Sequence, residues 1–324
     1  MLTLYPPLEP RRSGWLAVGE GHEVWFEDCG NPEGLPVVFL HGGPGSGCRS
    51  YHRQFFDPLR YRILLLDQRG AGRSRPLGAV LGNHTDALVA DLETLRLAMQ
   101  VERWVVFGGS WGATLALCYA SQHPERTLAL VLRGSFLARQ CDLDWFFVNG
   151  AKQMLPDAWA ALKQAFPGIA DPDLFAEIYR RVFEWDQTPR AEARRLAAAQ
   201  AWNDWGGAVA TASVPPVSTS PPARIPDTAT LLATSRIELH YAAARYFLVD
   251  QPLLSRISTC PRVPTTIVHG QRDLTCMPSA ALTLHQALPW AERIMVREAG
   301  HIASEPAMVD ALVGIMNQLP DHLI

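Results

Sequence analysis

A serine framed by glycines, Gly108-Gly109-Ser110-Trp111-Gly112, follows the apolar run 104–107 and precedes a segment with helical character. A strand that turns sharply into a helix needs glycine two residues on either side of the serine, because side chains there would collide with the neighbouring strand and helix. Such a turn lifts the serine hydroxyl clear of the sheet, where it can act as a nucleophile. Ordinary strand-helix turns produce the same pattern, so the rest of the chain decides its meaning.

Short apolar runs of strand-forming residues recur along the chain, at residues 36–40, 61–67, 104–107, 128–133 and 265–269. Nearly continuous apolar character suits parallel strands that helices cover on both faces. Between the runs, residues 86–100 repeat leucine at three- and four-residue intervals, and 113–121 is also compatible with a helix. The alternation predicts an α/β fold with a mostly parallel sheet and helices on both faces.

The alternation stops between residues 136 and 257, where the chain becomes helical in pattern and rich in tryptophan. We expect a catalytic domain formed by residues 1–135 and 258–324, with a mainly helical cap, residues 136–257, inserted before the last strands. Within the cap, a Pro/Ser/Thr-rich stretch near 208–230 predicts a long surface loop.

Composition and charge exclude several classes of partner. The 324 residues are 48% hydrophobic, and 29 basic against 32 acidic residues give a net charge of −3 without a run of lysines or arginines. Binding to nucleic acid or to an anionic membrane is therefore not expected. No window approaches the roughly 20 apolar residues of a membrane span, and the first residues lack the layout of a signal peptide. We expect a cytoplasmic protein, and the oligomeric state stays open.

The six cysteines are scattered, without C-x-x-C spacing or nearby pairs of histidine. This pattern favours free thiols over a metal site or a disulfide framework, so no metal is expected. Cys276 lies three residues after Asp273, an aspartate considered below, and its sulfur is therefore a candidate neighbour of the active site.

A second glycine-rich segment, His41-Gly42-Gly43-Pro44-Gly45, directly follows the first strong strand. Glycines at this place let backbone N–H groups approach a substrate carbonyl and form half of an oxyanion hole. Alone the segment would be an ordinary Gly/Pro turn. Together with the serine turn, it makes the backbone N–H groups of Gly43 and Trp111 the candidate oxyanion donors.

An acid and a base follow the serine in the order that this chemistry uses. Asp273 comes just after the predicted strand 265–269, and His301 comes later in Ala299-Gly300-His301. A serine nucleophile needs a neutral histidine as base and an aspartate that fixes the histidine tautomer. The order Ser110, Asp273, His301 therefore predicts a catalytic triad.

These motifs resemble those of the prolyl iminopeptidases (proline iminopeptidases), a family of the α/β-hydrolase superfamily. The resemblance covers nearly the whole chain and is carried by Leu4-Tyr5-Pro6-Pro7-Leu8-Glu9-Pro10, by segments 41–45, 108–112 and 300–301, and by Asp67-Gln68-Arg69-Gly70-Ala71-Gly72-Arg73-Ser74. It implies the α/β-hydrolase fold and a cytosolic exopeptidase that uses no metal or cofactor. It also implies that the substrates are short peptides with a free N-terminal proline, which is released through a covalent acyl-enzyme.

The resemblance extends to residues for substrate binding. An aminopeptidase needs a carboxylate for the cationic amine and aromatic walls for the proline ring. Glu238 matches a cap glutamate that the family uses for the amine, and Phe136 and Phe146 match aromatic residues of the family's pocket. Without the resemblance, a solvent-facing charge and core packing would be the ordinary explanations.

One position departs from the family. Similar members carry a second amine-binding glutamate after a Trp-x-x-Trp segment, whereas Trp202-Asn203-Asp204-Trp205 is followed by Gly206. Asp204 is the candidate substitute, although it lies two residues earlier. With one carboxylate instead of two, the amine should bind more weakly, because each charge-assisted hydrogen bond contributes roughly 1.5–3 kcal/mol.

Three functions remain compatible with these residues. The first is a serine aminopeptidase that releases N-terminal proline, and the second is an esterase or amidase that uses the same triad on other substrates. The third is a binding protein without catalytic activity, which would be expected to lack a triad or oxyanion element. A dehalogenase or epoxide hydrolase would need an acidic nucleophile at position 110, where this chain has serine.

Overall fold

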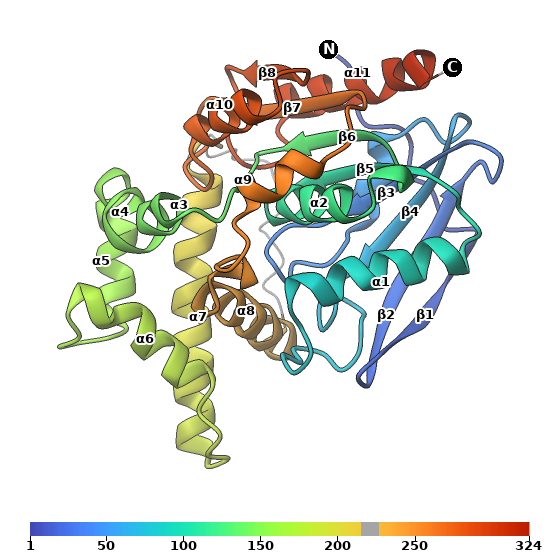
Figure 1. Ribbon diagram of the computed structural model, residues 1–324. Coiled ribbons are helices and arrows are strands. Elements are labelled where there is room, and N and C mark those ends of the chain that lie inside the picture. The colour runs from blue at the N-terminus through green and yellow to red at the C-terminus, as the bar shows by residue number, and fades with distance from the viewer. Residues whose placement is uncertain (215–226, 324) are drawn as a thin grey trace.

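The computed structural model describes residues 1–214 and 227–323. Its centre is an eight-stranded sheet in the order β1-β2-β4-β3-β5-β6-β7-β8, in which β1, β2 and β4 pair antiparallel and every later pair is parallel. The predicted α/β fold with a mostly parallel sheet is thus confirmed (Figure 1). The strands are β1 (Arg12–Gly19), β2 (His22–Gly30), β3 (Leu35–Leu40), β4 (Tyr61–Asp67), β5 (Trp104–Gly109), β6 (Thr127–Arg133), β7 (Thr265–Gly270) and β8 (Glu292–Val296).

The five runs predicted from the sequence are β3 to β7, and the three other strands lack continuous apolar character. In β2 the buried Glu27 interrupts the apolar pattern, and its charge is matched by the Arg53 guanidinium, with Nε 2.8 Å from the carboxylate. β8 lies at the sheet edge and begins with the exposed residues Glu292 and Arg293. Strands of this kind follow from pairing with their neighbours and not from apolar runs.

Both faces of the sheet are buried under helices. Val38 and Leu40 of β3 pack with α1, α2 and α10, whereas Val37 and Phe39 pack on the opposite face with α11. This alternation is the reason that parallel strands are apolar at nearly every position. The helices that cover the sheet are α1 (Thr85–Ala98), α2 (Trp111–Gln122), α10 (Pro278–Ala287) and α11 (Pro306–Leu323).

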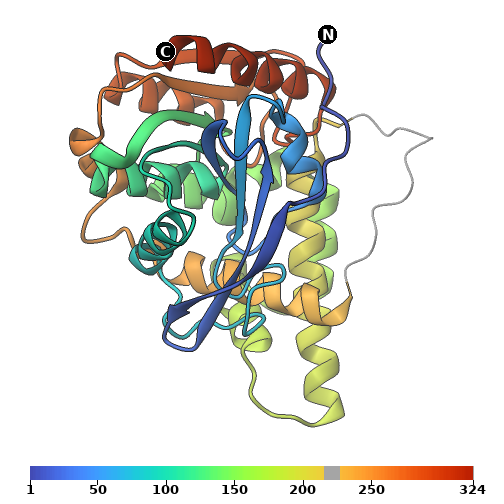
Figure 2. The same cartoon turned by 90° about the vertical axis from the view of Figure 1, so that its right-hand side faces the viewer.

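The chain between β6 and β7 is helical and lies largely to one side of the sheet (Figure 1). Here α7 crosses α8 (Figure 2), and both contribute to a separate hydrophobic core that contains Trp202, Trp205 and Leu231. The helices are α3 (Gln140–Asp144), α4 (Ala151–Met154), α5 (Pro156–Gln164), α6 (Asp171–Val182), α7 (Pro189–Thr211), α8 (Thr228–Ala243) and α9 (Leu253–Arg256).

The loop predicted near 208–230 is shorter in the structure at both ends. The helix α7 continues to Thr211 because residues 208–211 contain no proline and Val209 is buried in the hydrophobic core that contains Trp202 and Trp205. The helix α8 begins at Thr228, where the Asp227 carboxylate accepts a hydrogen bond from the Thr230 N–H. Residues 215–226 of the predicted loop lie outside the described residues.

Among the helices of the described ranges, none combines the length and the apolar character needed to cross a bilayer.

We expect Trp205→Ala to destabilise the protein. Trp205 is buried between helices and meets the Trp159 ring edge-on at 5.1 Å, so its loss leaves a large cavity. The free energy of unfolding should fall by about 3–5 kcal/mol in urea denaturation. Trp185→Ala is the matched control, because Trp185 is 91% exposed and its removal should change stability by less than about 0.5 kcal/mol. Equal effects of the two substitutions would contradict the existence of a packed cap core.

Candidate active site

Ser110 stands at the turn between β5 and α2 in a strained conformation, with φ 58° and ψ −123°. Two glycines make the turn possible. A Cβ on Gly108 would lie 2.1 Å from the Gly112 carbonyl oxygen, and a Cβ on Gly112 would lie 2.1 Å from the Leu40 carbonyl oxygen. No larger residue fits either position without moving a strand or the helix. The hydroxyl of Ser110 consequently lies at the carboxyl edge of the sheet.

Ser110, His301 and Asp273 form a hydrogen-bonded chain. His301 Nε2 lies 3.2 Å from Ser110 Oγ, and His301 Nδ1 lies 2.8 Å from Asp273 Oδ2. Burial alone raises the pKa of Asp273, but His301, its hydrogen bond and His269 hold that pKa below its usual value. Asp273 is therefore ionised at neutral pH. The arrangement can transfer the Ser110 proton to the imidazole while the carboxylate stabilises the resulting cation.

Asp273 is fixed from its other side. Its Oδ1 accepts hydrogen bonds from the Thr275 and Cys276 N–H groups, both at 2.9 Å. These two amides hold the carboxylate in place so that Oδ2 faces His301. Cys276 also lines the same cavity as Ser110, in agreement with the position expected for its sulfur.

Glu305 is a neighbour of His301 that the sequence analysis missed. Its buried carboxylate accepts hydrogen bonds from the N–H groups of Gly300, at 3.1 and 3.0 Å to the two oxygens, and of Ile302, at 3.0 Å. These amides flank His301 on both sides. The acid lies four residues after the histidine, and this spacing was the only signal available in the sequence.

The glycine-rich loop after β3 lies against Ser110. A Cβ on Gly42 would come within 3.1 Å of Ser110 Cβ, and Gly43, with φ +111°, lines the cavity. Gly43 must be glycine because a Cβ would approach the Gly45 nitrogen to 2.7 Å. Trp111 begins α2, where the first backbone N–H has no carbonyl one turn earlier in the helix to bind and is available for an oxyanion, whereas the Ala113 N–H already donates to the Ser110 carbonyl at 2.9 Å.

A buried network around Gln68 connects the two candidate oxyanion elements. The Trp111 indole donates to Gln68 Oε1 at 2.9 Å, and the Gln68 amide Nε2 donates to the His41 carbonyl at 2.9 Å. Gln68 N–H also donates to His41 Nε2, and burial lowers the pKa of His41, which is therefore neutral. The side chain of Trp111 thus points into the core, and Gln68 supports both the loop and the turn.

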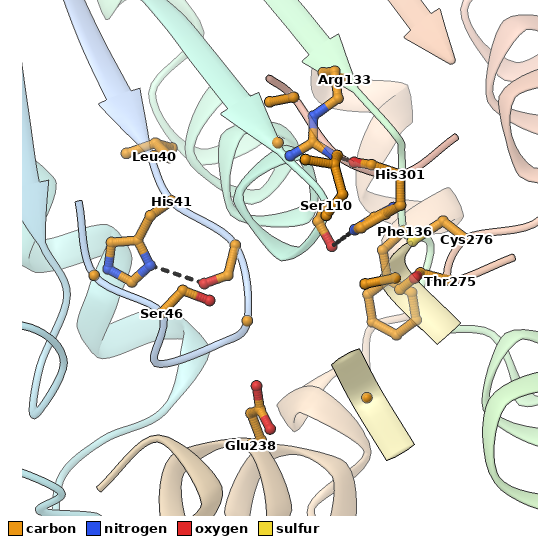
Figure 3. Close-up of a pocket in the computed structure, with 18 of the residues that line it drawn as sticks. Leu40, His41, Ser46, Ser110, Arg133, Phe136, Glu238, Thr275, Cys276 and His301 are labelled. Carbon is orange, nitrogen blue, oxygen red and sulfur yellow. Dashed lines mark hydrogen bonds between the residues drawn. The ribbon is translucent and has the colours of Figure 1, made fainter. Parts of the chain in front are cut away.

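A cavity of about 450 Å³ opens above Ser110 (Figure 3). The Phe136 and Phe146 side chains are partly buried and line this cavity. Phe136 packs edge-on against Tyr246 at 4.7 Å, and Phe146 packs against Trp202 at 6.0 Å. Tyr246, which the sequence analysis did not single out, is therefore part of the same apolar wall.

Glu238 of α8 faces Ser110 across the cavity (Figure 3). Its Oε2 accepts a hydrogen bond from Trp202 Nε1 at 2.8 Å. Burial raises the pKa of Glu238 to about 7, and the Trp202 bond offsets only part of that rise. The helix that carries Glu238 is held against the loop after β3, because Ile237 packs on Gly45. A single carboxylate in an aromatic enclosure can bind a cationic amine.

Asp204, the candidate for a second acid, does not reach the cavity. It is exposed, and its Oδ1 accepts a hydrogen bond from the Gln200 side chain at 2.6 Å. Trp202 and Gly206 lie four residues apart on the face of α7 that lines the cavity, so the residue midway between them points away. The interpretation of Asp204 as a substitute is wrong.

Asp142 is a second carboxylate at the cavity wall that the sequence analysis missed. Its two oxygens are taken by the Arg139 guanidinium, at 3.0 and 2.7 Å, and by the Arg139 N–H at 3.0 Å. Glu238 is thus the only carboxylate among the described lining residues that has no ion-pair partner. Residues 1–214 and 227–323 contain no group of three or more His, Cys, Asp or Glu side chains arranged to hold a metal ion.

Comparison with known proteins agrees with this geometry. The family described as alpha/beta hydrolase fold matches residues 36–307. A proline iminopeptidase of Xylella fastidiosa is 46% identical over 97% of this chain and 98% of its own length, and one of Neisseria meningitidis is 38% identical over 99% and 100%. A proline iminopeptidase-related protein of Thermus thermophilus superposes with a TM-score of 0.58, at 25% identity over 95% and 98% of the two chains.

The chain belongs to the proline iminopeptidase family of the alpha/beta hydrolase fold. The family resemblance and the fold class inferred from the sequence are thereby confirmed.

We expect the stability of the protein to depend on pH through Glu238. Burial places the pKa of Glu238 at about 7 in the folded state, against 4.5 as its ordinary value, so the folded state binds the proton more tightly. The resulting stability is fully present below about pH 4.5 and is lost as the pH rises through about 7. Tyr246 is the nearby titratable group, and its pKa is raised further above neutrality, so it stays uncharged.

Glu238→Gln removes this titration. Relative to the variant, the wild type should lose about 3 kcal/mol of unfolding free energy between pH 4 and pH 9. Urea denaturation of both proteins across this pH range measures the difference between their unfolding free energies. The contributions of all other titrating groups are common to both proteins and cancel in this difference. A difference that does not change with pH would contradict an enclosed, desolvated Glu238.

We also expect Glu305→Ala to slow the chemistry at Ser110, because His301 loses the two amide anchors that flank it. Phosphonylation of Ser110 by a fluorophosphonate requires the serine and its base but no particular substrate. The rate of this reaction should fall about 100-fold in Glu305→Ala. Glu298→Ala is the control. That acid is 69% exposed, pairs only with Arg272, and its removal should leave the rate unchanged.

Proposed function

We propose that the protein is a serine aminopeptidase that releases N-terminal proline from short peptides. The observation that carries the proposal is Glu238, which has no ion-pair partner within residues 1–214 and 227–323 and faces Ser110 across an aromatic cavity. The relatives of similar length that are named proline iminopeptidases support it. Residues 136–257 act as the cap that closes over a catalytic domain formed by residues 1–135 and 258–324.

The cavity selects the acyl group. The substrate's secondary ammonium donates to Glu238 while its pyrrolidine ring lies against Phe136 and Phe146. An acetylated proline has no charge for Glu238 and buries that carboxylate without a partner, which is unfavourable. Proline at the N-terminus of a peptide therefore binds with its carbonyl carbon near Ser110 Oγ.

Ser110 is the nucleophile of the reaction. Its oxygen attacks the proline carbonyl as His301 Nε2 takes the hydroxyl proton, and Asp273 stabilises the imidazolium. The oxyanion receives hydrogen bonds from the Gly43 and Trp111 N–H groups. The intermediate collapses when His301 returns the proton to the leaving amine, which gives a prolyl-Ser110 ester. Water, activated by His301, then attacks this ester, and free proline and Ser110 are released.

We expect proline arylamide to be hydrolysed far faster than acetyl-proline arylamide or simple esters. Ser110→Ala should lower kcat for proline arylamide at least about 10⁴-fold without unfolding the protein. Glu238→Gln should raise KM for this substrate about 10- to 100-fold, because a charge-assisted hydrogen bond becomes a neutral one. A chromogenic assay measures all three substrates.

Glu192→Gln serves as the matched control, because this acid is an exposed residue in the first turn of α7. It should retain wild-type kinetics. A preference for esters over proline arylamide would instead favour an esterase that uses the same residues, and turnover by Ser110→Ala would refute the assigned nucleophile.

A further inference from the structure

The cavity carries a positive group opposite Glu238. Arg133, the last residue of β6, lines the same cavity, and in Figure 3 Ser110 lies between the Arg133 guanidinium and the Glu238 carboxylate. The two charges come from different parts of the fold, one from the sheet and one from the cap. A substrate that meets both would carry opposite charges on the two sides of its scissile bond.

Arg133 has no carboxylate partner among the ion pairs of the described residues. Its Nη1 donates to the His301 carbonyl at 2.7 Å, while Nε is buried without a hydrogen bond. The strongest opposite charge acting on it is that of Asp273, whose oxygens already serve His301 and two backbone amides. A partly buried guanidinium that has no counter-ion among the described residues is costly, so the site is suited to an anion supplied from outside.

The Arg133 guanidinium packs against the backbone of Gly109, the residue before Ser110. A Cβ on Gly109 would come within 2.4 Å of Arg133 Nη2, so the glycine preceding Ser110 leaves room for this group. Arg49 also lines the cavity, from the segment after β3. Burial lowers the pKa of the neighbouring His52 to about 3, and His52 therefore adds no charge. This end of the cavity is cationic.

The cationic end lies beside His301 and opposite the end that carries Glu238. His301 returns its proton to the departing amine, and Arg133 binds the backbone of that same histidine. The acyl side faces Glu238. The two termini of an extended dipeptide are separated by about 7 Å, so the C-terminal carboxylate lies close behind the scissile bond only when one residue follows proline.

We propose that Arg133, with Arg49, binds the C-terminal carboxylate of the leaving residue, so that the preferred substrates are zwitterionic Pro-X dipeptides. This proposal rests on the proposed prolyl aminopeptidase function. It assigns the substrate two charge contacts, one at each end. Longer peptides place an uncharged peptide group where the carboxylate would be and lose the second contact.

The test compares kcat/KM for Pro-Ala, Pro-Ala-amide and Pro-Ala-Ala. The wild type should prefer Pro-Ala over the other two by about 10- to 100-fold, the range of a charge-assisted hydrogen bond. In Arg133→Gln the ratio of kcat/KM for Pro-Ala to kcat/KM for Pro-Ala-amide should fall close to the ratio set by the intrinsic reactivity of the two leaving amines. Any loss of catalysis caused by breaking the contact between Arg133 and His301 lowers kcat/KM for Pro-Ala-amide as well. The ratio of the two kcat/KM values therefore isolates binding of the carboxylate.

Arg126→Gln is the control, since Arg126 pairs with Glu125 on the surface away from the cavity, and its ratio should equal that of the wild type. Arg49→Gln changes an exposed position and should also lower the ratio. It keeps the proposal testable if Arg133→Gln fails to fold.

Four results are decisive. Equal rates on Pro-Ala and Pro-Ala-amide in the wild type, or an unchanged ratio in Arg133→Gln, would overturn the carboxylate site while leaving the aminopeptidase intact. Failure to hydrolyse any of the three peptides would instead refute the proposed function. A ratio that falls in Arg133→Gln and not in Arg126→Gln supports the site.

Discussion

The close approach of α2 to the ends of β3 and β5 is the constraint on which the site depends. Gly108 and Gly112 allow backbone to meet backbone at distances that no side chain would permit. That contact forces Ser110 into its strained conformation and directs the unpaired amides of the first turn of α2 toward the space above the sheet. The candidate nucleophile and one candidate oxyanion donor are therefore consequences of a single packing requirement.

The same edge of the sheet receives the other catalytic candidates because parallel strands end together. Asp273 follows β7 and His301 follows β8, so both arrive beside Ser110 although 163 and 191 residues separate them from it in sequence. Their loops are then fixed by backbone amides: two bind Asp273, and two others bind Glu305. Rigid placement of this kind is what a proton relay requires, since its rate depends on short and aligned distances.

The parts that could be predicted from the sequence were those in which one local cause decides the structure. Continuous apolar runs required buried parallel strands, and the glycine pattern required a sharp turn at Ser110. The strand β2 was not evident, because its Glu27 is buried only by virtue of arginines from distant segments. Asp204 could not be judged from the sequence either, because the direction of its side chain depends on how α7 is rotated relative to the cavity.

The sequence does not reveal the roles of Glu305, Asp142 and Arg133. None of them belongs to a recognisable motif, and each role depends on which groups the side chain contacts in the folded protein. The meaning of Asp142 depends on Arg139, which occupies both its oxygens, and that of Arg133 depends on the absence of such a partner. Two charged residues of the same cavity wall thus differ in what they offer a ligand. Spacing along the chain does not reveal which charges are already neutralised.

In our proposal, recognition of the substrate amine depends on a single carboxylate. Trp202 Nε1 donates to Glu238 Oε2, which leaves Oε1 and the remaining lone pair of Oε2 for the ligand, and Gly206 supplies no second acid. A secondary ammonium carries two N–H groups, and with a single acid either both share Glu238 or one of them binds water or a backbone carbonyl. The binding free energy that a second glutamate would contribute has to come from the aromatic walls and, in our proposal, from Arg133 at the opposite end. In our proposal, the binding free energy of the substrate is then shared along its whole length instead of being concentrated at its amine.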